Sequence, residues 1–546
     1  MLANTVRFGV NATALPILQH KKRDNKKIMS GKPKAFHRRD FIRLGAASGC
    51  AMASAGMPEF LFANQHPHPH PDSYGQLDRN MYVHNMEVHG HLFKGARRND
   101  EIEMMAIGER RFLFQQEAVV EVTNPLEPKI ISEGTYVGEG DIQLAFNESL
   151  GKWILISSAD VPSTSSHPDA YNGKYDDPSL INELLVRPGL RGIRIYDATD
   201  PTDIRPLSKW STDQLDPERE IQTGAGTAHN FYSGGRYAYL DAGFDNSFTH
   251  MESPVRYYTN GVQTLDLADP IEPKFVSNWW VPGQRQDEEE AYRNWRSYGD
   301  RLSFTCKNGG FFVPKKVEDG GRYAYSTWGS FGFLIHDVSD PAEPELIGKF
   351  VPPYLPGGIQ MYATDVNRLD RGFVVANPET LNPDCNEVWH DAYVLDVRDP
   401  TNLKKIGTLP VPQPPAEAPY DDFCDKRGRF GPRTPQNQKA PGKPHPNFSC
   451  YAYFVAGAQC FDLSDPAEPR ISGSFIPPQG GDLAIWNSYN RTVDIVFVEW
   501  DRKLIWVGSD TGLYVLSSPA LGKPVLGPME VEEWSLPGLN EGHDHS

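Results

Sequence analysis

One phrase, an apolar run that ends in Asp (Asn or Ser in two weaker copies) and then Pro, occurs seven times and constrains the fold more than any other feature. Its clearest copies are Leu265–Pro273, His336–Pro344 and Phe461–Pro469. Asp can hydrogen-bond its own backbone in a turn, and Pro fixes φ without offering a donor. Each copy therefore predicts the end of one strand and a turn into the next. The marker prolines are Pro125, Pro201, Pro270, Pro341, Pro400, Pro466 and Pro519.

Other strand-like runs accompany each copy. An aromatic run precedes it, as in Tyr237–Tyr239 and Tyr323–Tyr325, and a further run follows it, as in Lys274–Trp279. Runs rich in aromatic and β-branched residues, bounded by Gly, Asp and Pro, read as strands. With an initial strand in each unit, the repeat has strands A to D, the Asp-Pro phrase ending strand C. Seven such units predict an all-β fold, a seven-bladed β-propeller of four-stranded antiparallel blades over residues 104–535.

On these phrases the chain resembles the LVIVD-repeat family, secreted bacterial β-propellers named for the strand before the Asp-Pro turn. The resemblance covers about residues 110 to 520 and implies the propeller fold. It implies no catalytic motif.

The first 63 residues differ in character from the rest. Arg38 and Arg39 precede Phe41, and a mildly apolar Gly/Ala stretch runs on to Ala63. This order resembles a twin-arginine export signal, and Met29 is an alternative start. An ordinary helix carrying an Arg pair is the other reading. The signal predicts removal of residues 1–63 and a periplasmic or secreted location. Residues 64–103 then form a His-rich N-terminal segment and residues 536–546 a C-terminal tail.

Net charge and cysteine content limit the possible partners and predict cysteine pairs. The net charge of −17 disfavours nucleic acid and anionic membrane surfaces as partners, and no later apolar run is long enough for a transmembrane helix. In an exported protein disulfides can persist. Cys450 and Cys460 flank one predicted hairpin and are expected to be cross-strand neighbours, and Cys385 with Cys424 is the second expected pair.

Blade topology predicts where a site lies. The A–B and C–D turns, which are short, share one face of a propeller. The long insertions fall in the B–C and D–A loops, so all of them emerge on the other face: residues 158–190, 211–227, 241–259, 283–310, 377–391 and 412–446. Long loops gathered on one end of a rigid scaffold favour a binding or catalytic site there. Length drift without function is the alternative.

Counting back from each aromatic run aligns four polar residues of the inner strands. His229, Lys315 and Asp365 share one depth, and His445 joins them if its hairpin is shorter. These side chains are predicted to converge near the channel axis. The alternative is that His229 satisfies backbone groups at a strand start.

A loop next to His229 adds further candidates. His250, Arg256 and Tyr258 lie in the B–C loop of the third blade and open on the same face. Together with His229 and Lys315 they form a predicted acid–base site, in which Arg neutralises a carboxylate while His or Tyr moves protons. The candidates for substrate contact, besides His445 and Asp365, are His167, Tyr171 and His390.

Metal ligation is a separate possibility. His89 and His91 alternate on one predicted strand and share a face, a spacing seen in metal sites. They follow the repeated His-Pro run at residues 66–71. A divalent metal ion is therefore a candidate cofactor, although a His-rich tail also binds metal adventitiously.

Three functions remain open on these observations. An exported propeller with His, Tyr and Arg on its loop face resembles, in architecture, the propeller-type polysaccharide lyases that cleave uronate-containing (ulvan-like) polymers. The alternatives are a non-catalytic module that binds a protein or glycan, and a metal-dependent periplasmic oxidoreductase. The sequence lacks a phosphate-binding Gly loop, a Gly-x-Ser-x-Gly elbow and a His-Glu-x-x-His run.

Overall fold

A computed structural model describes most of the chain beyond the predicted signal. It covers residues 78–93, 101–115, 118–137, 140–159, 186–248, 259–296, 307–353, 361–380, 385–426, 428–436, 439–480 and 492–536. The chain divides into units 1–63 and 64–546, and the first lies outside the described residues.

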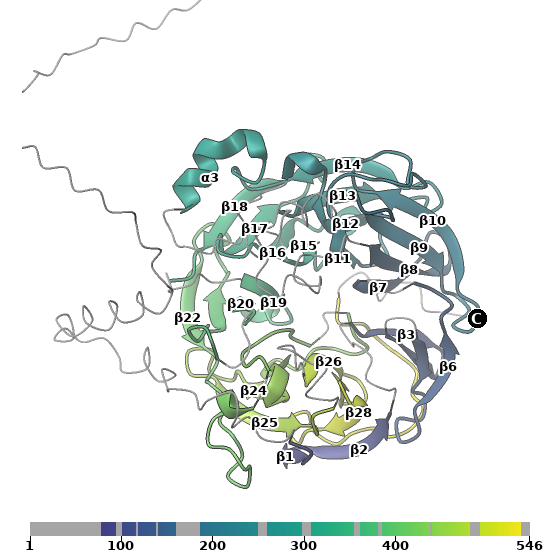
Figure 1. Cartoon of the computed structure of the whole chain (residues 1–546). Helices are drawn as coiled ribbons and strands as arrows, with labels where there is room; N and C mark the ends of the chain where they lie inside the picture. Colours follow the sequence, from purple (N-terminus) through teal and green to yellow (C-terminus); the bar gives the residue numbers. More distant parts are fainter. Residues whose placement is uncertain are drawn as a thin grey trace, which may run out of the picture. The chain divides into compact units, whose positions relative to one another are not determined.

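Seven four-stranded antiparallel sheets stand around one axis, which confirms the predicted seven-bladed propeller (Figure 1). Blades 1 to 5 each use four consecutive strands, which follow one another from the axis outward. Blade 1 has β3 (Glu103–Ile107), β4 (Arg110–Gln115), β5 (Ala118–Glu121) and β6 (Lys129–Glu133), and blade 2 has β7 (Ile142–Asn147), β8 (Lys152–Ala159), β9 (Gly192–Asp197) and β10 (Arg205–Ser211). Blade 3 has β11 (Gly226–Tyr232), β12 (Tyr237–Gly243), β13 (Gly261–Asp266) and β14 (Lys274–Trp279). Blade 4 has β15 (Lys307–Phe312), β16 (Tyr323–Thr327), β17 (Phe333–Asp337) and β18 (Glu345–Phe350), and blade 5 has β19 (Met361–Asp365), β20 (Phe373–Pro378), β21 (Tyr393–Asp396) and β22 (Lys404–Thr408).

The Asp-Pro phrases form the C–D turns. The Asp269 carboxylate accepts a hydrogen bond from the N–H of Ile271 at 3.0 Å, and the Asp269 carbonyl accepts one from Glu272 at 3.1 Å. Asp340 repeats the first bond with Ala342 at 2.9 Å. Asp thus closes the turn with its side chain, and the following Pro fixes the backbone angle of the turn.

The same prolines also set the spacing between blades. The carbonyl oxygen of Pro270 accepts a hydrogen bond from Ser208 on the outer strand of the preceding blade, and Pro341 accepts one from Ser277. At the next junction a Cβ added to Gly348 would lie 1.8 Å from the Pro400 carbonyl oxygen. Only a small residue fits where the outer strand meets this carbonyl, so the turn serves two blades at once.

The chain's N-terminal segment completes blades 6 and 7. The strands involved are β1 (Tyr82–His84), β2 (Glu87–Leu92), β23 (Phe448–Ala452), β24 (Ala458–Asp462), β25 (Arg470–Ile476), β26 (Val493–Glu499), β27 (Leu504–Ser509) and β28 (Gly512–Ser517). β2 pairs with β28 as the outer strand of blade 7, and β1 pairs with β25 on the rim of blade 6. The expected boundary near residue 104 was therefore wrong, because residues 82–92 belong to the propeller. A strand was expected at His89 and His91, but these strands carry no Asp-Pro phrase that would assign them to the repeat.

Blade 6 departs from the repeat at its inner edge. Instead of a regular strand, residues 433–436 run beside β23, where Pro435 bridges Tyr451 and the Gln436 N–H donates to the Cys450 carbonyl at 2.8 Å. Further along, the Lys439 side chain contacts the inner strands of blades 1 to 3. The Lys439 ammonium group bonds Glu103 at 3.1 Å and the carbonyls of Leu144 and Tyr232 at 3.2 and 3.0 Å. Burial lowers the pKa of Lys439, and Glu103 acts against this.

A buried ionic cluster joins blade 7 to blade 1. The Glu499 carboxylate accepts hydrogen bonds from Arg111 at 2.5 Å, from Arg502 at 2.7 and 2.9 Å, and from the Trp506 indole at 3.0 Å. The side chains of Arg111, Glu499 and Arg502 are fully buried. Burial alone raises the pKa of Glu499, but Arg502 and Arg111 outweigh it and lower the pKa below its ordinary value.

Aromatic side chains fill the space between blades 3 and 4. Trp279, Phe311 and Trp328 pack there around His336, which is fully buried. The His336 ring lies 4.2 Å from the Trp279 ring and 4.5 Å from the Phe311 ring, and neither of its nitrogens has a hydrogen-bond partner among the described residues. Burial lowers the pKa of His336 to about 3.

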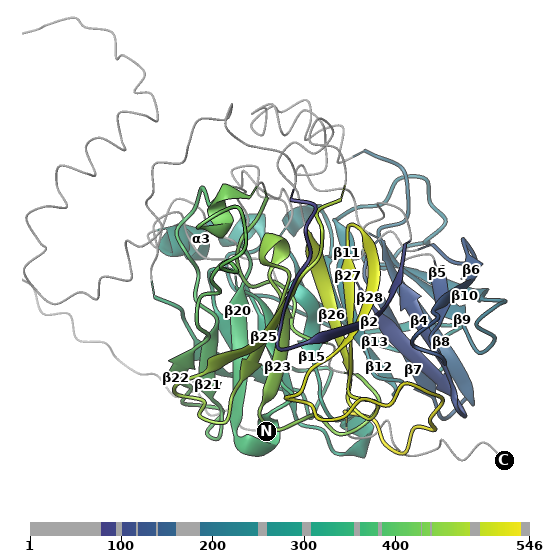
Figure 2. The same ribbon diagram turned by 90° about the horizontal axis from the view of Figure 1, so that it is seen from below.

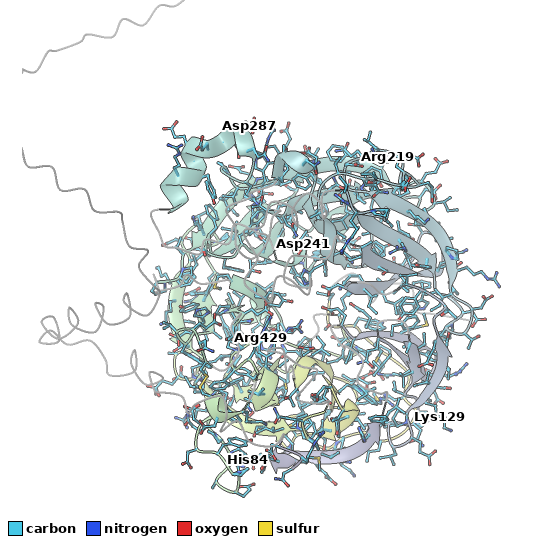
Figure 3. All side chains as sticks on the ribbon, viewed as in Figure 1. His84, Lys129, Arg219, Asp241, Asp287 and Arg429 are labelled. Atoms are coloured by element: carbon cyan, nitrogen blue, oxygen red, sulfur yellow. A yellow bond between two sulfur atoms is a disulfide. The ribbon has the colours of Figure 1, made fainter. Side chains whose placement is uncertain are left out.

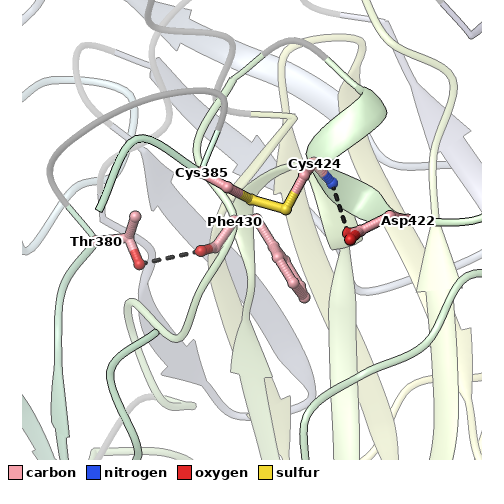
Figure 4. Close-up of a disulfide and its surroundings, with 5 residues drawn as sticks. All are labelled: Thr380, Cys385, Asp422, Cys424 and Phe430. Atoms are coloured by element: carbon pink, nitrogen blue, oxygen red, sulfur yellow. Dashed lines mark hydrogen bonds between the residues drawn. A yellow bond between two sulfur atoms is a disulfide. The ribbon is translucent and has the colours of Figure 1, made fainter. Parts of the chain in front are cut away.

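Both expected cysteine pairs are neighbours in space. Cys385 and Cys424 form a disulfide with Cα atoms 5.4 Å apart, and the Asp422 side chain accepts from the Cys424 N–H beside it (Figure 4). Cys450 and Cys460 are directly opposite on β23 and β24, as free thiols. This confirms the predicted cross-strand placement.

Short helices lie in the connections between strands. They are η6 (Asn246–Phe248), η7 (Gln286–Glu288), α3 (Glu289–Arg296), η8 (Val317–Asp319), η9 (Leu369–Arg371), η10 (Phe423–Asp425) and η11 (Phe454–Ala456). Seen across the axis, α3 lies toward one end of the strands, the end where the B–C and D–A loops emerge (Figure 2). We call this the loop end and the opposite one the turn end. Within the described residues no helix is long and apolar enough to cross a membrane.

Candidate functional site

The structure gives His229 a fixed carboxylate partner that the sequence analysis did not identify. His229 on β11 and Asp241 on β12 are directly opposite in register, and the His229 Nδ1 lies 2.8 Å from the Asp241 Oδ2. The other oxygen of Asp241 accepts from the backbone N–H groups of His229 at 2.8 Å and Ala228 at 3.1 Å. This arrangement orients the imidazole. It favours the tautomer in which Nδ1 carries the proton and donates it to the Asp241 carboxylate.

A β-bulge makes this contact possible. The register of β11 against β12 shifts between Thr227 and His229, so that Ala228 is the extra residue. A bulge takes backbone groups out of the ladder and re-aims the adjacent side chain. The two freed N–H groups bind Asp241, and the bulge thereby places His229 at the loop end of the inner strand. In Figure 3 the labelled Asp241 lies on the inner side of the ring, whereas Lys129, Arg219 and Asp287 lie on the rim.

The second nitrogen of His229 faces two groups from other blades. The hydroxyl of Tyr362, on β19 of blade 5, lies 3.4 Å from His229 Nε2, and the Asp141 carboxylate, just before β7 of blade 2, lies 3.6 Å from it. The rings of His229 and Tyr362 meet edge to face at 5.9 Å. His229 is 9% exposed and Tyr362 5%. With Nδ1 held by Asp241, Nε2 is the atom that can accept a proton.

Two buried arginines border this group on the side of blades 6 and 7. The Arg433 guanidinium lies 5.9 Å from the centre of the Tyr362 ring and donates to the Asp494 carbonyl at 2.6 Å. Arg429 pairs with Glu379 at 2.9 Å, and Arg433 approaches the same carboxylate at 3.8 Å. The site therefore combines one His, one Tyr and two guanidinium groups with several carboxylates.

Two further titratable groups lie toward the same end of blades 6 and 7. Burial raises the pKa of Asp510 to about 7, and nearby Asp494 adds to the rise while Lys426 opposes it. Burial lowers the pKa of Lys426 to about 8. Their charges therefore change near neutral pH.

Five of the predicted site residues cannot be placed. His250, Arg256 and Tyr258 of the blade 3 loop, and His167 and Tyr171 of the blade 2 loop, lie outside the described residues.

Lys315 does not join the channel, which corrects the alignment made from the aromatic runs. Blade 3 connects its first two strands through residues 233–236, but blade 4 uses residues 313–322, which include η8. The longer hairpin puts Lys315 in the turn, where it is exposed, at the turn end of blade 4. Equal counting from the aromatic run therefore reached different depths in the two blades.

Asp365 and His445 also lie away from His229. Asp365 is three residues beyond Tyr362 on β19, fully buried, and binds Arg368 at 2.7 Å. His445 is not on an inner strand, because residues 433–436 take that place in blade 6. Burial lowers the pKa of His445, and so does Arg368, while Asp462 at the C–D turn raises it. His390 is buried in the connection between β20 and β21.

The two histidines expected as metal ligands do not point to one place. His89 Nε2 lies 2.8 Å from the Ser517 hydroxyl, while His91 Nε2 lies 2.9 Å from the Thr511 carbonyl and its ring stacks on Tyr514 at 4.2 Å. A register shift between Val88 and Gly90 separates them. Across the part of the chain that is described, no group of three or more His, Cys, Asp or Glu side chains is arranged to hold a metal ion.

Sequence reasoning missed Asp241, Tyr362, Asp141 and Arg433. One signal was present for Asp241. Five residues into the aromatic strand, blade 3 has Asp241 where blade 4 has Thr327 and blade 5 has Asn377. A carboxylate at this position, opposite a histidine, was the departure from the repeat that marked the site.

Comparison with known proteins finds other propellers and no finer assignment. No family model matches the chain, and no curated protein matches it. Solved structures similar to it include the WD40 repeats of RRP9, 7% identical over 81% of this chain and 99% of that one with a TM-score of 0.37. Others are the Cps50 (Swd1) β-propeller domain of Myceliophteria thermophila, 10% identical over 80% and 99% with a TM-score of 0.39, and a hypothetical selenium-binding protein from Sulfolobus tokodaii, 13% identical over 80% and 84% with a TM-score of 0.41.

Proposed function

We propose that this protein is an acid–base enzyme in which His229 is the general base and Tyr362 the general acid. The observation that carries the proposal is the geometry around His229 Nε2. Asp241 holds Nδ1 at 2.8 Å, and the Tyr362 hydroxyl lies 3.4 Å from Nε2. A base needs an orienting partner and an acid within reach of the same reacting centre. These three residues supply that set from blades 3 and 5.

The reaction class that we propose is β-elimination on a uronate-containing polysaccharide. His229 would remove the proton next to the carboxylate, and Tyr362 would protonate the leaving sugar oxygen. Neutralising the substrate carboxylate requires a guanidinium, and the Arg433 guanidinium lies 5.9 Å from the centre of the Tyr362 ring. This arrangement replaces Tyr258 and Arg256, which the sequence favoured, with residues whose positions are described.

The test is turnover on a panel of uronate-containing and neutral polysaccharides, followed by the ultraviolet absorbance of the conjugated double bond that elimination creates. His229→Ala and Tyr362→Phe should each lose about 10²–10⁴ in rate. His445→Ala is the matched control, because His445 lies at the turn end, and it should keep full activity. Wild-type rates in His229→Ala would overturn the assignment on any substrate that the protein converts.

A non-catalytic binding module is the second candidate. The low exposure of His229 and Tyr362 favours it, since a substrate must reach groups that are mostly covered. The same panel separates the two functions. A binding module would retain a glycan or protein ligand with no product formed, and His229→Ala would leave that binding intact.

A further inference from the structure

The two thiols inside blade 6 lie unusually close together. Cys450 of β23 and Cys460 of β24 are directly opposite in register, and their Sγ atoms are 3.0 Å apart. Both residues are fully buried. The S–S bond of a disulfide measures about 2.05 Å, so a shift of about 1 Å separates this pair from bonding distance.

The backbone around Cys450 suits a cross-strand bond. Its N–H donates to the Gln436 side chain at 2.6 Å, and its carbonyl accepts from the Gln436 N–H at 2.8 Å. Both groups thus point toward the inner segment rather than toward Cys460. In antiparallel sheets such a non-hydrogen-bonded pair has Cα atoms about 4.5 Å apart, which falls within the disulfide range of about 4.4–6.8 Å.

We propose that Cys450 and Cys460 form a second disulfide, which locks the hairpin of blade 6. The oxidant is a disulfide, either a thiol–disulfide oxidoreductase or oxidised glutathione. A Cys450 thiolate attacks it to give a mixed disulfide, and Cys460 then displaces the oxidant's second sulfur. The two cysteines lose two protons and two electrons, and the oxidant is reduced to two thiols.

The folded hairpin itself resists this reaction. Burial raises the pKa of Cys460 well above its ordinary value, and Cys450 adds to the rise. A buried thiol that is not ionised is a poor nucleophile. Oxidation therefore takes place while the hairpin is forming or open, and the closed blade then protects whichever redox state it holds.

The proposed Cys450–Cys460 disulfide restrains a hairpin turn that borders the candidate site. The hairpin turns through η11, where Phe454 has φ of +49°, a conformation unfavourable for a bulky side chain. The Val455 N–H donates to the Arg429 carbonyl at 3.2 Å, and the guanidinium groups of Arg429 and Arg433 lie 5.5 and 5.9 Å from the Phe454 ring. An effect on catalysis through Arg433 rests on the proposed function; formation of the bond does not.

The bond can be read directly by mass spectrometry. The full chain is unfolded, reduced, and refolded in mixtures of oxidised and reduced glutathione, then unfolded in alkylating reagent without reductant. No Lys or Arg separates Cys450 from Cys460, so one tryptic peptide ending at Arg470 carries both. We expect this peptide to be two hydrogens lighter than its reduced form and to carry no alkyl group. Alkylation of both cysteines at every glutathione ratio would overturn the proposal.

A matched pair of variants separates the lock from the loop-end disulfide. Cys450→Ala/Cys460→Ala should abolish the mass difference and speed amide hydrogen exchange over residues 453–457. Cys385→Ala/Cys424→Ala should leave both signals as in the oxidised wild type. Equal exchange rates in oxidised and reduced wild-type protein would show that no lock exists. A lock confirmed in a protein without turnover would reject only the proposed function.

Discussion

Two buried polar clusters of the propeller use their hydrogen bonds differently, and the difference separates a structural group from a candidate reactive one. In the cluster between blades 7 and 1, the Glu499 carboxylate receives four hydrogen bonds of 2.5–3.0 Å from Arg111, Arg502 and Trp506. At the loop end, His229 has one short contact, to Asp241, while its Nε2 meets longer ones of 3.4 and 3.6 Å.

The two clusters differ in whether a substrate can compete for their hydrogen bonds. A carboxylate that already accepts four strong bonds offers no position to another molecule, and breaking it up costs stability. An imidazole that is oriented on one side and loosely contacted on the other keeps a nitrogen for chemistry. The first cluster should therefore respond to mutation in stability, and the second in turnover.

The largest expected effect is on the stability provided by the Glu499 cluster. Glu499→Ala leaves two buried guanidinium groups without their shared carboxylate, and removing one partner of a buried ion pair costs about 3–5 kcal/mol. We expect urea denaturation to show a loss of this size. Glu272→Ala, on an exposed turn, serves as control and should be neutral. An Ala variant of Glu499 with wild-type stability would erase the distinction between the two clusters.

The next effect concerns Asp241, the carboxylate that orients His229. Asp241→Asn keeps the volume but presents an amide that cannot hold His229 in the same tautomer, so turnover should fall by about 10²–10⁴. The free energy of unfolding should change by less than in Glu499→Ala. Comparing both quantities for both variants sharpens the comparison. A loss of stability in Asp241→Asn as large as in Glu499→Ala, with activity per folded molecule kept, would make Asp241 structural.

His336 provides a third case, a buried polar group whose nitrogens find no partner among the described residues. His336→Leu removes two unsatisfied nitrogens from an apolar site, and we expect a gain of about 1–2 kcal/mol at pH 7. The folded pKa of about 3 lies below the ordinary 6.5, so the unfolded chain binds the proton and wild-type stability falls as the pH drops below 6.5. Denaturation at pH 7 and pH 5 should show the Leu variant's advantage growing toward pH 5. A constant advantage would mean that His336 is charged when folded.

The smallest effect is expected at the exposed turns. The Arg398 side chain lowers the pKa of Asp396 to about 2, below its ordinary 3.8. The stabilisation is therefore complete above pH 4 and is lost as the pH falls toward 2. Asp396→Asn should change stability little at pH 7, since surface ion pairs contribute little, and the difference from wild type should vanish near pH 2. A difference that persists at pH 2 would need a cause other than this charge.

The repeated parts of the molecule could be predicted from sequence because each repeat carries the same kinds of turn and strand residues. Five Asp-Pro phrases and one Asn-Pro phrase give the C–D turns of blades 1 to 6, and the copy at Pro519 follows the third strand of blade 7. The aromatic runs give the second strands of the blades, so the fold class and blade number followed. The opposition of Cys450 and Cys460 followed as well, because both flank one short hairpin.

The site was predicted only in part because its members depart from the repeat. His229 was found, but Lys315 was aligned with it by counting across hairpins of unequal length. Tyr362 reaches His229 from two blades away, and no periodicity encodes such a distance. The bulge at Ala228, which frees the N–H groups that bind Asp241, depends on register and has no composition signal.

The pairing of β2 with β28 has a consequence for how the chain is made. Glu87 lies opposite Ser517, so β2 leaves the ribosome long before its partner β28. Contacts between residues so distant in sequence form slowly, and unpaired strands invite association with other chains. A product truncated before β28 therefore leaves an unpaired edge on both β2 and β27 of blade 7. Blade 7, and with it the ring, can close only after β28 has been synthesised.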